Sequence, residues 1–125
     1  MRIKFTFDEI FEKQKQNQVA LLKMGSYEGF ASHDIDDLPD DDPKLMSYHI
    51  QQLVSEIGEV LEADKRWKNF RKDKFDRHEK LMEIADCFIV LMNIGMFSGF
   101  SGDEIANAIF EKEQVVSERI EAERD

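Results

Sequence analysis

The stretch that decides the fold is LMEIADCFIVLMNIGMF, residues 81–97, which is apolar on nearly every side of a helix. A helix of this kind is typical of the centre of a helical protein. Its most apolar part, residues 84–97, is too short to span a bilayer and contains Asp86 and Asn93, so no membrane partner is expected. The chain has 125 residues, of which 42% are hydrophobic, with only six Gly and two Pro. We therefore expect a single all-α domain over residues 1–125.

Four helices are predicted from their start signals. Thr6 and Ser101 are each followed three residues later by Glu, Asp76 is followed by Glu at the same spacing, and Asp42 precedes a proline. The expected helices cover residues 7–23, 43–70 and 77–97, and a fourth runs from residue 102 toward the C-terminus. The segment 25–42 is expected to be a flexible loop, because residues 34–42 hold six Asp and a Pro. A calcium-binding loop is disfavoured, because the spacing of an EF-hand and its terminal Glu are missing. Candidate core residues on the first two helices are Ile10, Phe11, Val19, Leu22, Ile50, Leu53, Ile57, Val60 and Leu61.

Two acidic pairs lie on the second and third predicted helices. Glu56 and Glu59 form one pair, and Glu83 and Asp86 form the other. Residues three apart share a helix face, so antiparallel packing of the two helices would bring four carboxylates together. Such a group requires a cation, and oxygen ligands favour Mg²⁺, with Mn²⁺ or Ca²⁺ as alternatives. Asp86 carries the most weight, because apolar residues flank it and an unpaired buried carboxylate is costly.

Other metal chemistry fits the sequence poorly. A di-iron bundle needs Glu-x-x-His on two helices, and no His lies three residues after a Glu. Zinc would need a Cys/His cluster, and Cys87 is the single cysteine. We interpret Cys87 as a small core residue in a reducing compartment, which predicts a cytoplasmic location.

The charge of the chain is unevenly distributed. A formal net charge of −10 argues against general binding to a nucleic-acid backbone. The segment 65–77, which lies between the two acidic pairs, nevertheless contains seven basic residues: Lys65, Arg66, Lys68, Arg71, Lys72, Lys74 and Arg77. This segment is either a solvated helix end and loop or a surface that binds phosphates beside a metal site.

Together these motifs resemble those of the all-α nucleoside triphosphate pyrophosphatases, which include the MazG-like proteins and the dimeric dUTPases. The resemblance rests on the two acidic pairs and on the segments FEKQKQNQ (11–18), EIGEVLEADKRWKNF (56–70) and KLMEIADCFIVLMNIG (80–95). It covers residues 11 to about 119. It implies a four-helix bundle assembled as a homodimer or a dimer of dimers, with sites near the interface. The apolar third helix also favours a homodimer, because four helices of one subunit would not cover it.

The resemblance implies Mg²⁺-dependent cleavage of a (deoxy)nucleoside triphosphate, with dUTP as one candidate, to the monophosphate and pyrophosphate. It assigns the metal and catalytic roles to Glu56, Glu59, Glu83 and Asp86. Candidate substrate-binding residues are Gln14, Asn17, Trp67, Lys68, Arg71, Lys112 and Arg119. Val116 stands where the family has an Asn. That departure keeps open a catalytically inactive module of the same fold that binds nucleotide or protein, and a purely structural acidic bundle is a third reading.

Overall fold

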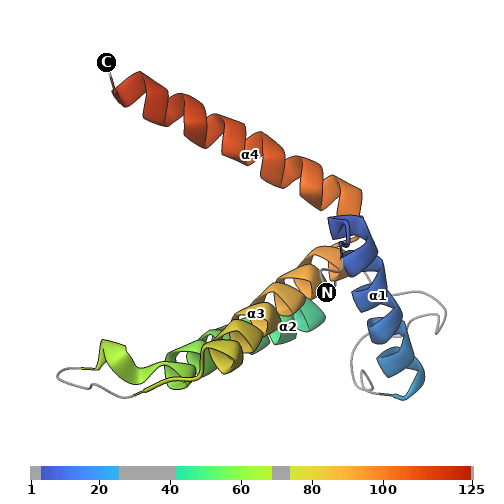
Figure 1. Cartoon of the computed structure of the whole chain (residues 1–125). Coiled ribbons are helices and arrows are strands. Elements are labelled where there is room, and N and C mark those ends of the chain that lie inside the picture. The colour runs from blue at the N-terminus through green and yellow to red at the C-terminus, as the bar shows by residue number, and fades with distance from the viewer. Residues whose placement is uncertain (1–3, 26–41, 69–73, 125) are drawn as a thin grey trace.

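The computed structural model describes residues 4–25, 42–68 and 74–124, and these residues form helices and no strands (Figure 1). The elements are α1 (Phe7–Lys23), α2 (Pro43–Ala63), the short 3₁₀ helix η1 (Lys65–Trp67), α3 (Arg77–Phe97) and α4 (Gly102–Glu123). The prediction of an all-α protein is confirmed. Residues 26–41 of the predicted acidic loop, and Arg71 of the candidate site, lie outside the described residues.

Side-chain caps begin all four α-helices, as predicted. Thr6 and Ser101 each accept a hydrogen bond, 3.1 Å long, from the backbone N–H three residues on, and both capping boxes are closed. The carboxylates of Asp42 and Asp76 accept from two N–H groups in the first turns of α2 and α3. These caps satisfy donors that a helix start would otherwise leave unpaired, which explains where the four helices begin.

The end of α2 differs from the prediction. The helix stops at Ala63 instead of continuing to residue 70. Asp64 has an extended backbone (φ −140°, ψ 98°), and its side chain accepts from the N–H of Arg66 to cap η1. A side chain that offers the backbone a hydrogen bond outside the helix competes with helix continuation, which accounts for the break.

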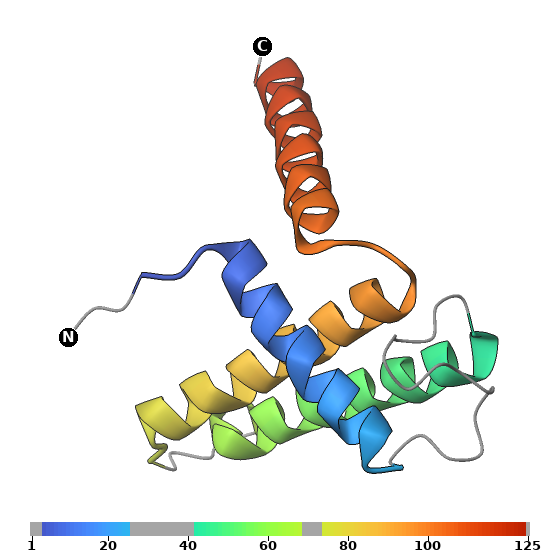
Figure 2. The ribbon, with the colours of Figure 1, turned by 90° about the vertical axis from the view of Figure 1, so that its right-hand side faces the viewer.

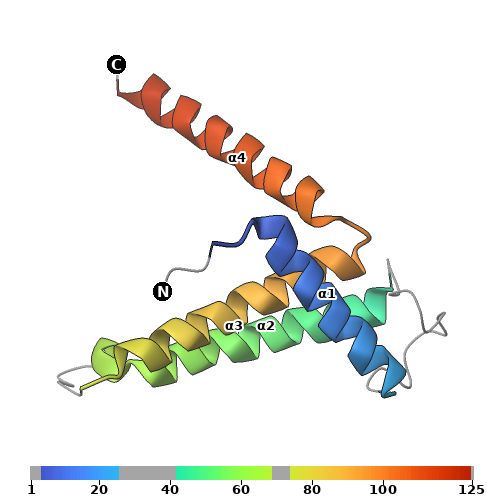
Figure 3. The ribbon, with the colours of Figure 1, turned by 45° about the vertical axis from the view of Figure 1, so that its right-hand side comes forward.

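The four helices form a hairpin, a crossing helix and a projecting helix. α2 and α3 lie side by side and antiparallel (Figures 1 and 3). α1 crosses this hairpin, as Figure 2 shows. α4 packs against α1 near its own start and then leads away from the hairpin, with a bend of 111° between α3 and α4. A single chain does not close a four-helix bundle in this arrangement, so the bundle stays a prediction.

The core lies where α1 crosses the hairpin. Phe11, Leu45, Met92, Met96 and Phe97 are all buried there and form one cluster. Burying a side chain of this size contributes about 1.5–3 kcal/mol. The core therefore fixes α1 over the end of the hairpin that is farther from the α2–α3 connection.

The start of α4 enters this region through a glycine. A Cβ on Gly102 would lie 2.7 Å from Oδ1 of Asp8 and 3.0 Å from the Cβ of Phe11. Only a residue without a side chain lets the first turn of α4 approach α1 this closely. None of the described helices is by itself long and apolar enough to cross a membrane; α3 and α4 meet that test only as a bent pair.

Part of the predicted core is wrong for the single chain. Phe11 is buried, but Ile10, Ile50, Ile57 and Leu61 are each 44–50% exposed. The remaining candidates, Val19, Leu22, Leu53 and Val60, are half-buried. For Ile50, Ile57 and Leu61 the reason is that α1 covers only one side of the hairpin, and no other described element of the same chain covers the opposite side.

Candidate metal and substrate site

The structure brings three of the four predicted carboxylates together. Glu56 of α2 and Glu83 and Asp86 of α3 each offer an oxygen, and these oxygens lie within 4.8 Å of one another. All three residues are half-buried on the contact between the two helices. Three carboxylate oxygens at this separation are a donor set that suits a hard divalent cation.

Glu59 lies outside this group. Its side chain is exposed, one turn beyond Glu56 on α2, and its oxygens are not among those within 4.8 Å. It is still close enough to contribute to the raised pKa of Glu83. The prediction of four converging carboxylates is therefore corrected to three, with Glu59 at the edge.

Negative charge dominates the electrostatics of the site. Burial raises the pKa of Glu83, and the nearby charges of Asp86, Glu59 and Glu56 raise it further. The same environment raises the pKa of the Cys87 thiol, through burial first and then through the carboxylates. A cation among these groups would relieve the repulsion and favour their ionised forms.

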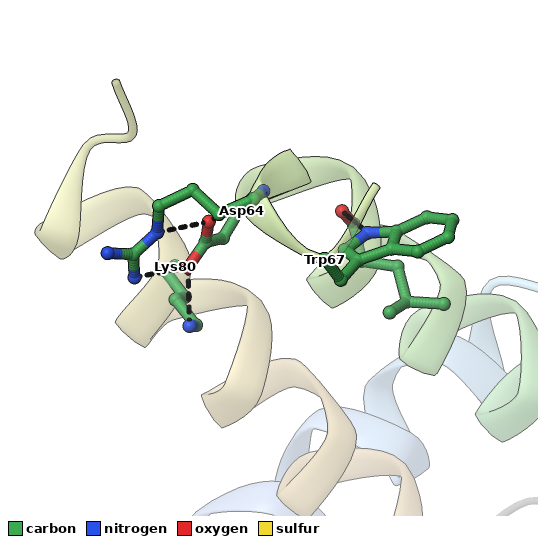
Figure 4. Close-up of polar contacts among 5 residues, drawn as sticks. Asp64, Trp67 and Lys80 are labelled. Atoms are coloured by element: carbon green, nitrogen blue, oxygen red, sulfur yellow. Dashed lines mark hydrogen bonds and ion pairs between the residues drawn. The ribbon is translucent and has the colours of Figure 1, made fainter. Parts of the chain in front are cut away.

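Two cations of the described basic segment, Lys65 and Arg66, are already paired. The carboxylate of Asp64 receives Arg66 on both oxygens, with Nε and a terminal nitrogen at 2.8 Å, and receives Lys80 Nζ at 2.8 Å (Figure 4). Hydrogen bonds from Arg66 and then from Lys80 hold the pKa of Asp64 well below its usual range. Lys65 forms an ion pair with Glu62 at 3.4 Å. These cations form ion pairs with carboxylates of the same chain, which weakens the interpretation of the whole segment as a phosphate-binding surface.

Trp67 and Lys68 remain at the surface beside this cluster. The Trp67 indole N–H donates to the carbonyl of Leu61 at 3.0 Å, and the side chain is 57% exposed. Lys68 Nζ lies 5.5 Å from the centroid of the Trp67 ring. The indole is thus held in place and also open to solvent, as a stacking surface for a ligand would be.

The two candidate residues on α1 differ in their surroundings. Gln14 is buried, and its Nε2 donates to Oδ1 of Asn93 on α3 at 2.8 Å, whereas Asn17 is exposed. Both line a groove of about 630 Å³ beside α1, together with Ile10 and Ile89. The buried amide of Gln14 therefore joins α1 to α3. Sequence reasoning did not identify Asn93 as its partner.

α4 carries the last two candidates away from the carboxylates. Lys112 and Arg119 are exposed, and Val116 between them is 47% exposed. α4 diverges from the α2–α3 hairpin in all three ribbon views (Figures 1–3). One chain therefore does not bring these two cations to the site.

Comparison of the chain with family models, with curated proteins and with solved structures finds no match. The functional argument accordingly depends on the residues and their geometry.

Proposed function

We propose that the protein is a Mg²⁺-dependent pyrophosphohydrolase that cleaves a (deoxy)nucleoside triphosphate, with dUTP as one candidate, to the monophosphate and pyrophosphate. The observation that supports this most directly is the convergence of Glu56, Glu83 and Asp86 from two antiparallel helices. The resemblance of the two acidic pairs to the all-α nucleoside triphosphate pyrophosphatases supplies the reaction class.

The three carboxylates suit Mg²⁺, or Mn²⁺ as an alternative, in number and in chemistry. When bound, the ion would neutralise triphosphate oxygens and polarise a water molecule. Glu59 is exposed and lies outside the close group, so it is available to orient or deprotonate the attacking water. The role of Glu56, Glu83 and Asp86 is then to hold the ion at a fixed place between the two helices.

Substrate contacts would come from the candidates at the surface near the hairpin and on α1. Trp67 offers a ring face for stacking, and Lys68 offers a cation beside it. Asn17 projects from the wall of the groove beside α1, where an amide could hydrogen-bond a base edge. Gln14 would support this groove from within through its bond to Asn93.

A second copy of the chain would complete the four-helix bundle. Exposed apolar residues recur every three or four positions along both helices of the hairpin: Ile50, Val54, Ile57 and Leu61 on α2, and Leu81, Ile84, Phe88 and Leu91 on α3. Phe88 lies about 140° around the helix from Asn93, which faces α1. Two such stripes are more exposed apolar surface than a monomer normally leaves uncovered. Packing of two hairpins through them would give a homodimer with a bundle core.

The direct test is a nucleotide assay. The protein is incubated with Mg²⁺ and each common ribo- and deoxyribonucleoside triphosphate, and pyrophosphate, monophosphate and orthophosphate are measured. We expect pyrophosphate and monophosphate in equal amounts from at least one nucleotide. Asp86→Asn should abolish that release, while Glu62→Gln, an equal charge change on the same hairpin, should not. Release of orthophosphate alone, or no turnover with any nucleotide, would refute the proposal.

The alternative is a catalytically inactive helical module of the same fold that binds nucleotide. It is favoured by Val116, which presents an apolar, 47% exposed side chain where the family has an Asn. In that case Mg²⁺ with nucleotide would raise the melting temperature of the wild-type protein but not of Asp86→Asn, and no pyrophosphate would form.

A further inference from the structure

We propose that Asp64 is a positioning residue, whose ion pair with Lys80 sets the register in which α2 and α3 present the three carboxylates. The inference rests on the proposed function, because it concerns the same metal site. It goes beyond that function by assigning a role to two residues that do not touch the metal or the substrate.

Both carboxylate oxygens of Asp64 are hydrogen-bonded at the end of the hairpin where α2 connects to α3. Its side chain is only 8% exposed, and each oxygen accepts two hydrogen bonds. Oδ1 accepts from the backbone N–H and from Nε of Arg66, and Oδ2 accepts from a terminal nitrogen of Arg66 and from Lys80 Nζ (Figure 4). A carboxylate whose acceptor sites are occupied by cations is unsuited to bind a metal ion. Asp64 is therefore chemically distinct from the three carboxylates of the site.

The ion pair joins two points with a defined relation to the site. Asp64 lies eight residues after Glu56 on one arm of the hairpin, a rise of about 12 Å, and Lys80 lies three residues before Glu83 on the other, a rise of about 4.5 Å. Since the two helices are antiparallel, fixing Asp64 against Lys80 fixes how far α2 is shifted along α3. It thereby fixes which turn of α2 faces Glu83 and Asp86.

The metal site needs such a restraint from outside. Its three carboxylates offer oxygens within 4.8 Å of one another, so their like charges repel and nothing in the group itself favours its compact form before a cation binds. The contact of Asp64 with Lys80 is an attraction across the same two helices. It offsets that repulsion and prepares the site for the cation.

Neighbouring contacts make the end of the hairpin a rigid support. The guanidinium carbon of Arg66 lies 3.9 Å from the centroid of the Phe75 ring, and Lys80 Nζ lies 5.2 Å from it. Phe75 immediately precedes Asp76, the N-cap of α3. The Trp67 indole N–H binds the carbonyl of Leu61 in the last turns of α2. Asp64 thus joins the end of α2, η1 and the start of α3.

The test compares Asp64→Asn and Lys80→Met with two controls in the full-length chain. Asp64→Asn keeps the shape of the side chain and removes its charge, whereas Lys80→Met leaves Asp64 paired with Arg66 and avoids a buried unpaired charge. Lys80→Arg retains the cross-helix ion pair. Glu62→Gln removes an exposed ion pair at the same end of the hairpin. The melting temperature of each protein is followed against Mg²⁺ concentration, and pyrophosphate release is measured in parallel.

We expect the Mg²⁺ concentration for half-maximal stabilisation to rise roughly tenfold in Asp64→Asn and Lys80→Met, as for residues that orient metal ligands. Lys80→Arg and Glu62→Gln should match the wild type. A lower melting temperature in metal-free Asp64→Asn and Lys80→Met, with an unchanged half-maximal Mg²⁺ concentration, would show a merely structural role and overturn the inference. If the wild type itself shows no response to Mg²⁺, the proposed function fails and the inference fails with it. A higher half-maximal Mg²⁺ concentration confined to Asp64→Asn and Lys80→Met supports the inference, and pyrophosphate release by the wild type supports the proposed function.

Discussion

The hydrogen bond between Gln14 and Asn93 offers a quantitative test of how α1 is attached to the hairpin. Gln14 Nε2 donates to Asn93 Oδ1 at 2.8 Å, and the two residues are 9% and 4% exposed. The perturbation is a pair of single substitutions, Gln14→Leu and Asn93→Leu, and their combination. Each single substitution removes the bond and leaves a buried amide without its partner, while the double substitution removes both polar groups.

The expected magnitudes follow from this geometry. Losing the bond and leaving one buried amide unsatisfied should cost about 2 kcal/mol in each single variant. The double variant should lose less than either single variant, because replacing both partners by apolar groups is nearly neutral. For a chain of this size, about 2 kcal/mol corresponds to a decrease of about 6–10 °C in melting temperature.

The assay is urea unfolding, followed by circular dichroism at one fixed protein concentration so that any dimerisation contributes equally. The three variants and the wild type form a double-mutant cycle that isolates the coupling between the two side chains. If Gln14→Leu costs less than about 0.5 kcal/mol and the two effects simply add, the bond does not hold α1 in place. Gln14 would then be available for the substrate.

Three further predictions concern the charge, assembly and packing of the molecule. Without metal, Glu83→Gln should be more stable than the wild type at neutral pH. The raised pKa of Glu83 means that the stability it contributes is present at low pH and is lost as pH rises through that pKa, and melting curves against pH in chelator check this. Phe88→Asp should dissociate the proposed homodimer in light scattering, while Phe110→Asp, similarly exposed at 66% against 64%, should not; a wild-type monomer would contradict the proposed assembly. Gly102→Ala should lose about 1–3 kcal/mol through its contacts with α1. Gly58→Ala, whose Cβ would meet no atom within 4 Å, should gain about 0.5–1 kcal/mol, as urea unfolding can measure.

The features predicted well from the sequence depend on residues that are close together in the chain. A cap depends on a residue and its neighbour three positions on, so Thr6 and Ser101 could be identified directly. The carboxylate group was predictable because helix periodicity places Glu83 and Asp86 on one face, and antiparallel packing brings Glu56 to it.

The features missed depend on partners far apart in sequence or, in the proposed assembly, on a second copy of the chain. Gln14 and Asn93 are 79 residues apart, and Asp64 and Lys80 are 16 apart, so neither contact leaves a local pattern. The apolar stripe that includes Ile57 was assigned to the core, because a face buried inside a chain and a face left for a second chain have the same periodicity.

The attachment of α4 at one end only makes this helix a lever. Its 22 residues correspond to a length of about 33 Å, and the close contact of Gly102 with Phe11 lies at its first turn. A tilt of about 10° at that pivot would move the far end by about 6 Å. Small rearrangements where α1 meets α4 would therefore become larger displacements of Lys112 and, farther along the helix, of Arg119.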